Sequence, residues 1–144
     1  MERVLLPLDG SMLSERSMST AADVARALGV PVTVVRVVAP LESIYLADGD
    51  HAAGLDRVIG EMEEEAQGYV EAKARQMEAL GVAAEGRVLH GYPSTQLLDL
   101  AQRHPHGLFV MTTHGRSGIG RVLLGSVTDR VARASGAPVL ILRP

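Results

Sequence analysis

The chain has 144 residues, of which 47% are hydrophobic, and its formal net charge at pH 7 is −3. Such a chain can bury a sizeable core, so we expect one folded domain over residues 1–144 and no intrinsic disorder. The mild negative charge is unlike the basic surfaces that bind nucleic acids. Because there is no cysteine, disulfides and thiolate metal sites are excluded.

The N-terminus leads directly into a strand-like pattern and does not have the pattern of a signal peptide. No apolar run approaches the roughly 20 residues that a membrane helix needs. We therefore expect a soluble, cytoplasmic protein with neither nucleic acid nor membrane as a partner.

The first 38 residues alternate between strand and helix patterns. Residues 4–8 form an apolar run that predicts a buried strand, and residues 32–38 are a β-branched run that predicts a second strand. Between them, apolar side chains recur on one helix face until Gly29 ends the helix. This βαβ pattern predicts a parallel sheet with helices on both faces.

The remaining elements follow in the same alternation. Residues 39–56 have no clear period and are predicted to form a mobile loop that can include a helical turn, and residues 57–80 are predicted to form a long amphipathic helix. Residues 82–89 predict a third strand, although Gly86 weakens the pattern. A helix beginning at Pro93, a fourth strand ending near Met111, a helix over 127–135 and a fifth strand over 138–142 complete the chain.

The stretch from Val110 to Thr128 has the pattern of an anion-binding segment. It runs from a buried strand through a glycine-rich loop to a helix start at Gly125-Ser126. Glycines let the backbone approach a phosphate, and a helix N-terminus offers unpaired N–H groups and partial positive charge. The same pattern also fits a βα loop followed by an ordinary capped helix. The stretch contains neither a Walker A motif nor a G-x-G-x-x-G fingerprint.

This stretch resembles the signature of ATP-binding members of the universal stress protein family. That signature is Gly, two residues, Gly, nine residues, then Gly-Ser or Gly-Thr. Here Gly115 is followed by nine residues and then by Gly125-Ser126, whereas Thr112 stands at the first glycine position. Residues 6–11, Gly91 with Pro93, and residues 138–141 also match the family, so the resemblance covers almost the whole chain.

The resemblance implies a doubly wound, five-stranded parallel, Rossmann-like sheet of strand order 3-2-1-4-5. Ligands of such sheets bind where the winding reverses, here between strands one and four. The family's pattern implies that Asp9 contacts adenine or ribose and that Val37 lines the adenine pocket. It implies ATP or AMP as the ligand, with or without magnesium, and these binding residues: Pro7, Asp9, Val37, Met111, Thr112, Gly115, Arg116, Gly125, Ser126, Val127 and Thr128.

Three functions remain open at this point. The first is a nucleotide-binding module that signals stress through its bound state, favoured by the retained Gly115 and Gly125. The second is a slow ATPase that needs a partner, although the loop carries no Walker-type lysine or carboxylate cluster. The third is an interaction protein that binds no nucleotide, favoured by Thr112. We predict no catalytic residue and no protein-held metal.

The fifth strand lies at an edge of the predicted sheet. Its sequence, Pro-Val-Leu-Ile-Leu, is too apolar to be left exposed. The resemblance implies that two such edges pair across a two-fold axis, so we expect a homodimer through the C-terminal strand.

Overall fold

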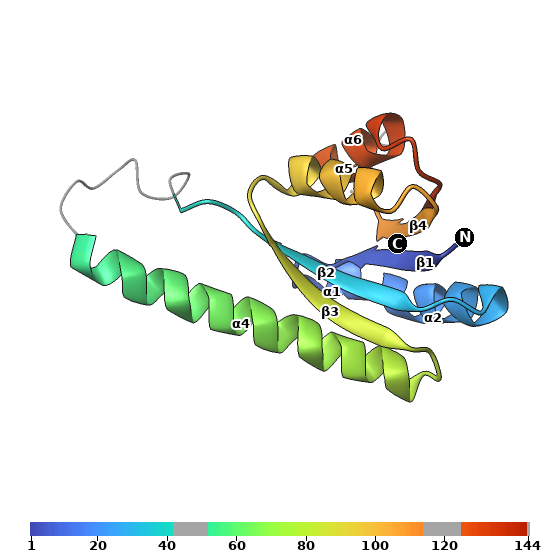
Figure 1. Cartoon of the computed structure of the whole chain (residues 1–144), viewed down its shortest axis with the longest axis horizontal. Helices are drawn as coiled ribbons and strands as arrows, with labels where there is room; N and C mark the ends of the chain where they lie inside the picture. The colour runs from blue at the N-terminus through green and yellow to red at the C-terminus, as the bar shows by residue number, and fades with distance from the viewer. Residues whose placement is uncertain (42–51, 114–124, 144) are drawn as a thin grey trace.

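The computed structural model describes residues 1–41, 52–113 and 125–143 (Figure 1). Its five strands pair in parallel in one sheet of order β3-β2-β1-β4-β5. The strands are β1 (Arg3–Pro7), β2 (Val32–Val38), β3 (Ala84–His90), β4 (Gly107–Thr112) and β5 (Val139–Leu142). The predicted fold class and strand order are therefore confirmed.

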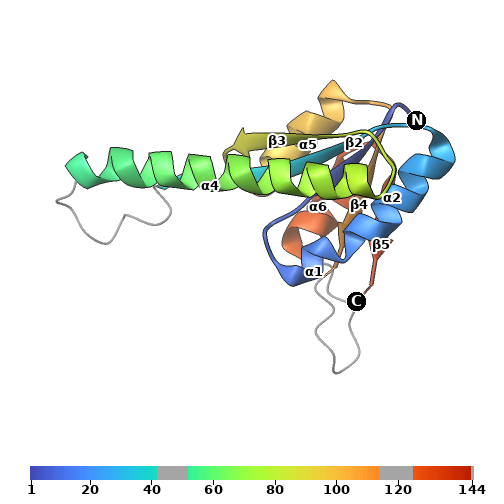
Figure 2. The same cartoon turned by 90° about the horizontal axis from the view of Figure 1, so that it is seen from below.

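Helices cover both faces of the sheet, as Figures 1 and 2 show. They are α1 (Met12–Glu15), α2 (Ser17–Leu28), α4 (Ala52–Ala79), α5 (Pro93–Arg103) and α6 (Ser126–Ala134). Side chains that alternate along each strand divide the core in two. Val4 and Leu6 pack with residues of α2 and α4, whereas Leu5 packs with residues of α5 and α6.

Two predicted helix ends are found in the structure. Gly29 follows α2 in the left-handed conformation, at φ 64°, and its N–H bonds to the last turn of the helix. Pro93 stands in the first turn of α5, where a missing N–H costs no hydrogen bond. Gly29 therefore ends α2 shortly before β2 begins, and Pro93 sets the start of α5 after β3.

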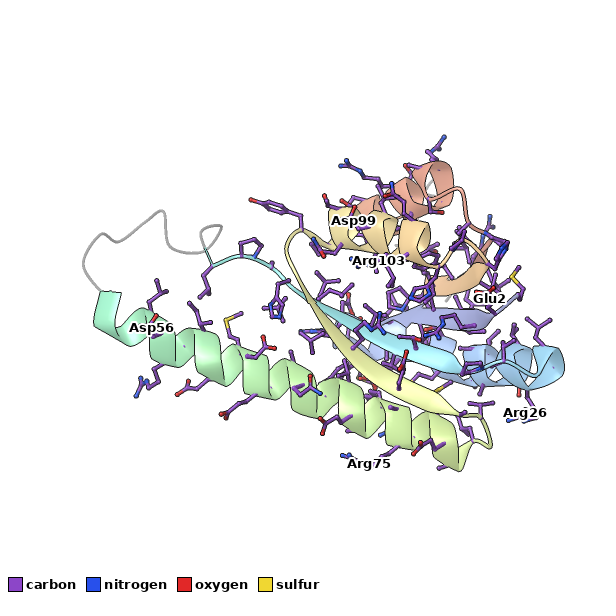
Figure 3. The ribbon with its side chains drawn as sticks, in the orientation of Figure 1. Glu2, Arg26, Asp56, Arg75, Asp99 and Arg103 are labelled. Carbon is purple, nitrogen blue, oxygen red and sulfur yellow. The ribbon has the colours of Figure 1, made fainter. Side chains whose placement is uncertain are left out.

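The prediction for residues 39–56 is wrong at its end, because α4 begins at Ala52 and includes residues 52–56. Gly54 and the short side chains there weaken the helical period, and the helix forms as the first turns of a long element. Residues 42–51 of that segment lie outside the described residues, and the prediction that the segment is mobile falls on them. Along the rest of α4, side chains such as Arg75 point away from the sheet (Figure 3).

Gly86 has a packing role that the strand pattern did not reveal. A Cβ atom at this position would lie 2.8 Å from the backbone carbonyl carbon and oxygen of Val70. The missing side chain therefore lets α4 cross β3 at close range.

In the described ranges, no helix is both long enough and apolar enough to cross a membrane.

Candidate functional site

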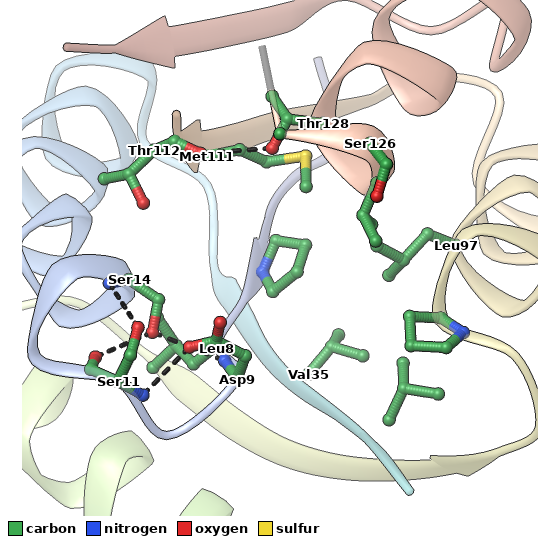
Figure 4. A pocket seen from close by; sticks show the side chains of 15 residues that line it. Leu8, Asp9, Ser11, Ser14, Val35, Leu97, Met111, Thr112, Ser126 and Thr128 are labelled. Atoms are coloured by element: carbon green, nitrogen blue, oxygen red, sulfur yellow. Dashed lines mark hydrogen bonds between the residues drawn. The ribbon is translucent and has the colours of Figure 1, made fainter. Parts of the chain in front are cut away.

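A cavity of about 310 Å³ opens at the carboxyl ends of β1, β2 and β4 (Figure 4). After β1 the chain passes to α1 and α2 on one face, whereas α6, which follows β4, packs on the other. This divergence leaves a crevice between two neighbouring strands, which is where open α/β sheets bind ligands. The first turns of α5 and α6 close the cavity from the second face.

The floor of the cavity is apolar. Leu8, Val35, Leu97 and Met111 line it and are each at most 6% exposed. Pro7, Val37 and Pro93 continue the same surface toward the opening. Such a surface fits a flat, weakly polar group better than a charged one.

A tight turn carries Asp9 at the cavity edge. The backbone N–H of Ser11 donates to Asp9 Oδ1 at 2.8 Å, and Gly10 has φ 85°, which favours glycine. The N–H of Ser14 donates to Ser11 Oγ at 3.1 Å. Ser11 and not Asp9 therefore caps α1, and the exposed Asp9 carboxylate lies at the rim of the cavity.

The N-terminus of α6 forms the opposite side. Gly125 is its N-cap and, within the described residues, no side chain caps the first turn. The N–H groups of this turn are therefore available to an anion beside Ser126, which is exposed. Gly125 has φ −52° and ψ 143°, a conformation that other residues also adopt.

The hydroxyl of Thr128 has a structural partner. Thr128 is 5% exposed, and its Oγ1 donates to the carbonyl oxygen of Thr112 at 3.1 Å. The resemblance places Thr128 among the binding residues, and in the structure its hydroxyl fastens α6 to the end of β4. The Thr112 side chain remains half-buried and lines the cavity (Figure 4).

Nine of the eleven predicted binding residues line this one cavity: Pro7, Asp9, Val37, Met111, Thr112, Gly125, Ser126, Val127 and Thr128. The other two, Gly115 and Arg116, lie outside the described residues. The sequence reasoning did not select Leu8, Ser11, Ser14, Val35, Pro93 and Leu97, which also line it. Leu8 and Val35 lie near the ends of predicted strands, and this position could have indicated that they line the cavity. The sequence does not show that α5 brings Pro93 and Leu97 to this crevice.

The described part of the chain holds no group of three or more His, Asp or Glu residues that could bind a metal ion. Among the described residues that line the cavity, only the Asp9 carboxylate and hydroxyl or backbone oxygens could bind a metal ion.

The fold and the cavity are those of a Rossmann-like α/β protein with its site at the sheet's switch point. Residues 1–143 match the universal stress protein family, and the chain belongs to that family. A universal stress protein of Methanocaldococcus jannaschii is 29% identical over 143 residues, which are 99% of this chain and 82% of that protein.

Solved structures agree with this fold. The universal stress protein UspA of Lactobacillus plantarum superposes with a TM-score of 0.74 at 21% identity, over 99% of this chain and 97% of that one. A universal stress protein crystallised in complex with cAMP gives a TM-score of 0.69 at 26% identity, over 99% and 96% of the two chains.

Proposed function

We propose that this protein is an adenine-nucleotide-binding module, for ATP or AMP, that acts in a stress response through its bound state. One observation carries the proposal. The switch-point cavity has an apolar floor, a carboxylate at one rim and an uncapped helix N-terminus at the other. These are the three surfaces that a base, a ribose and a phosphate require.

Each part of the nucleotide has a matching group in the cavity. The base would lie on the apolar floor near Val37, and the Asp9 carboxylate would accept hydrogen bonds from the ribose or the adenine amino group. The phosphates would face Gly125 and Ser126, with Gly115 and Arg116 as predicted further contacts. The relative that was crystallised with cAMP supports the choice of an adenine nucleotide.

Magnesium would reach this site with the phosphates of ATP, since the lining offers it few carboxylates. Fast hydrolysis also requires a group that orients the attacking water. Asp9, the only carboxylate that lines the described part of the cavity, lies on the rim opposite α6. We therefore propose a binding role without rapid turnover.

The direct test is to purify the protein, denature it by heat and identify the released nucleotide by chromatography and mass spectrometry. ATP or AMP in about equimolar amount with the protein is the expected result. Turnover of added ATP with magnesium then separates a binding module from a slow ATPase. A nucleotide-free protein that also fails to bind ATP and AMP in titration calorimetry would contradict the proposal.

Thr112 supports the main alternative, an interaction protein that binds no nucleotide, because its side chain lines the cavity where the family signature has glycine. The variant Thr112→Gly distinguishes two roles of this residue. If the side chain obstructs the ligand, ATP should bind the variant more tightly than the native protein. If the hydroxyl holds a phosphate or ribose oxygen, ATP should bind the variant more weakly.

A further inference from the structure

Arg36 packs directly beneath the turn that carries Asp9. A Cβ atom on Gly10 would lie 2.6 Å from Arg36 Nη1, so the guanidinium occupies the space that a side chain at Gly10 would need. Arg36 projects from β2 into a second cavity of about 430 Å³, on the α4 side of the sheet. Asp9 and Val37 line both cavities, so the turn lies between them.

Helix α4 holds the guanidinium from the other side. Arg36 Cζ lies 5.5 Å from the centre of the Tyr69 ring, within the range of a cation–π contact. The Tyr69 hydroxyl donates to Glu15 Oε1 at 2.8 Å, and Lys73 Nζ donates to Glu15 Oε2 at 2.7 Å. Glu15 belongs to α1, the helix that the Asp9 turn leads into. The contacts therefore close a ring from the turn through β2 and α4 back to α1.

The groups around Glu15 and Tyr69 set the protonation state of each of these two side chains. The hydrogen bond from Lys73 lowers the pKa of Glu15 against the opposing effect of burial, so Glu15 is a carboxylate at neutral pH. Burial, with a smaller effect of the hydrogen bond to Glu15, raises the pKa of Tyr69, so its hydroxyl stays protonated and donating. Asp9 and Glu65 also line the second cavity, which makes it a poor site for a further anion.

The position of Arg36 carries a cost. Its Nη1 is buried, and no hydrogen-bond acceptor for it lies among the described residues. A buried donor without a partner is unfavourable, so a shorter or apolar side chain would be expected here if packing alone mattered. The packing of this guanidinium on Gly10 suggests a role in shaping the turn.

We propose that Arg36, supported by the Tyr69 ring of helix α4, is a positioning residue that fixes the Asp9–Gly10–Ser11 turn. Through this turn, Arg36 positions the part of the site that would hold the base and ribose of the nucleotide. The ligand part of this inference rests on the proposed function, whereas the support of the turn does not. Neither side chain lines the first cavity, so both act through Asp9.

The support of the turn is tested without ligand by hydrogen exchange of backbone amides. Arg36→Gln removes the planar guanidinium, so the amides of residues 10–14 should exchange about tenfold faster or more, while the strands keep their protection. Arg87→Gln is the matched control, since Arg87 is a partly exposed arginine on neighbouring β3 and does not line either cavity. Unchanged exchange at the turn in Arg36→Gln would overturn the proposal.

The ligand part is tested by calorimetric titration of AMP into the same proteins. Arg36→Gln should weaken AMP binding about tenfold, and in an Asp9→Ala background it should weaken binding little further, because Asp9 transmits the effect. Tyr69→Phe keeps the ring and should bind within about twofold of the native protein, whereas Tyr69→Leu should behave like Arg36→Gln.

The possible failures are distinguishable. Additive losses in the double variant, or native affinity in Arg36→Gln, would show that Arg36 does not act through Asp9. If the native protein binds no nucleotide while the turn loosens in Arg36→Gln, the proposed function fails and the support of the turn stands.

Discussion

Gly125 and Ser126 begin α6 together but should contribute differently to binding. Gly125→Val places a branched side chain where a phosphate must approach the helix N-terminus. Losing a few hydrogen bonds to a charged group, at about 1.5–3 kcal/mol each, should weaken ATP binding at least tenfold. Because Gly125 has φ −52°, the variant should keep its fold, and the effect comes from steric exclusion and not from backbone strain.

Ser126→Ala is the matched control for this prediction. It keeps the backbone N–H at the same place, so ATP affinity should fall less than in Gly125→Val. Titration calorimetry at one salt and magnesium concentration measures both variants, with folding checked by circular dichroism. Native affinity in a folded Gly125→Val protein would place the nucleotide elsewhere.

His104, at the end of α5, should make stability depend on pH. Burial and the positive charges of Arg3, Arg87 and Arg103 lower the pKa of His104, and its Nε2 has no hydrogen-bond partner among the described residues. The unfolded chain takes up this proton near pH 6.5, while the folded chain does so only at lower pH. The unfolded state therefore binds more protons between the two pKa values, and stability falls as pH falls through that window.

Urea unfolding at about pH 7.5 and about pH 5.5 tests this expectation. His104→Gln should lose less free energy of unfolding across that interval than the native protein. His106→Gln, an exposed histidine two residues away, should behave like the native protein. The pKa values of Glu15 and Glu85 are lowered from 4.5, so their protonation contributes below this interval. An equal pH dependence in His104→Gln and the native protein would refute the assignment.

At the scale of elements, the contact between α4 and β3 should tolerate no side chain at Gly86. Gly86→Ala places a methyl group 2.8 Å from the Val70 backbone, and α4 must move away from the sheet. We expect a loss of about 1–3 kcal/mol in the free energy of unfolding. Gly68→Ala, within α4 itself, meets nothing within 4 Å and should instead stabilise the protein by about 0.5–1 kcal/mol. Denaturant unfolding of the two variants should therefore give changes of opposite sign.

The sequence predicted elements where the hydrophobic period was strong and missed contacts that depend on packing. β-branched runs located β2, and Gly29 and Pro93 marked helix ends. The start of α4 was missed because Gly54 and its short neighbours weaken the helical period. The role of Gly86 was missed because no local pattern shows how one long helix crosses a neighbouring strand.

The candidate site divides in the same way. The family signature located Gly125 and Ser126, and the further match at residues 6–11 located Asp9; the structure gathers all three around one cavity. It could not indicate that Leu97 reaches that cavity from α5, or that the Thr128 hydroxyl is already bonded to Thr112. Arg36 was missed because within the strand pattern it is one polar residue among valines, and its contact with Gly10 exists only in the folded chain.

At the scale of the whole molecule, the two edges of the sheet differ. The β3 edge carries Glu85 and Arg87, and such charges oppose pairing with another sheet. The β5 edge, Val139–Leu142, is entirely apolar, and its side chains are only partly buried in one chain. We therefore predict a homodimer through β5. Light scattering at micromolar concentration should report about twice the 15.3 kDa mass of the chain, and a monomer at that concentration would refute the prediction.

The proposed adenine-nucleotide site lies at the carboxyl ends of β1, β2 and β4. The most direct measurement is a titration of the ¹⁵N-labelled, nucleotide-free protein with AMP and with ATP, followed by NMR. Binding at this site predicts saturable shifts that are largest at the amides of Asp9, Val37, Thr112 and Ser126, with smaller shifts along α2 and β5. The absence of saturable shifts with either nucleotide, or shifts centred on α2 or β5, would contradict it.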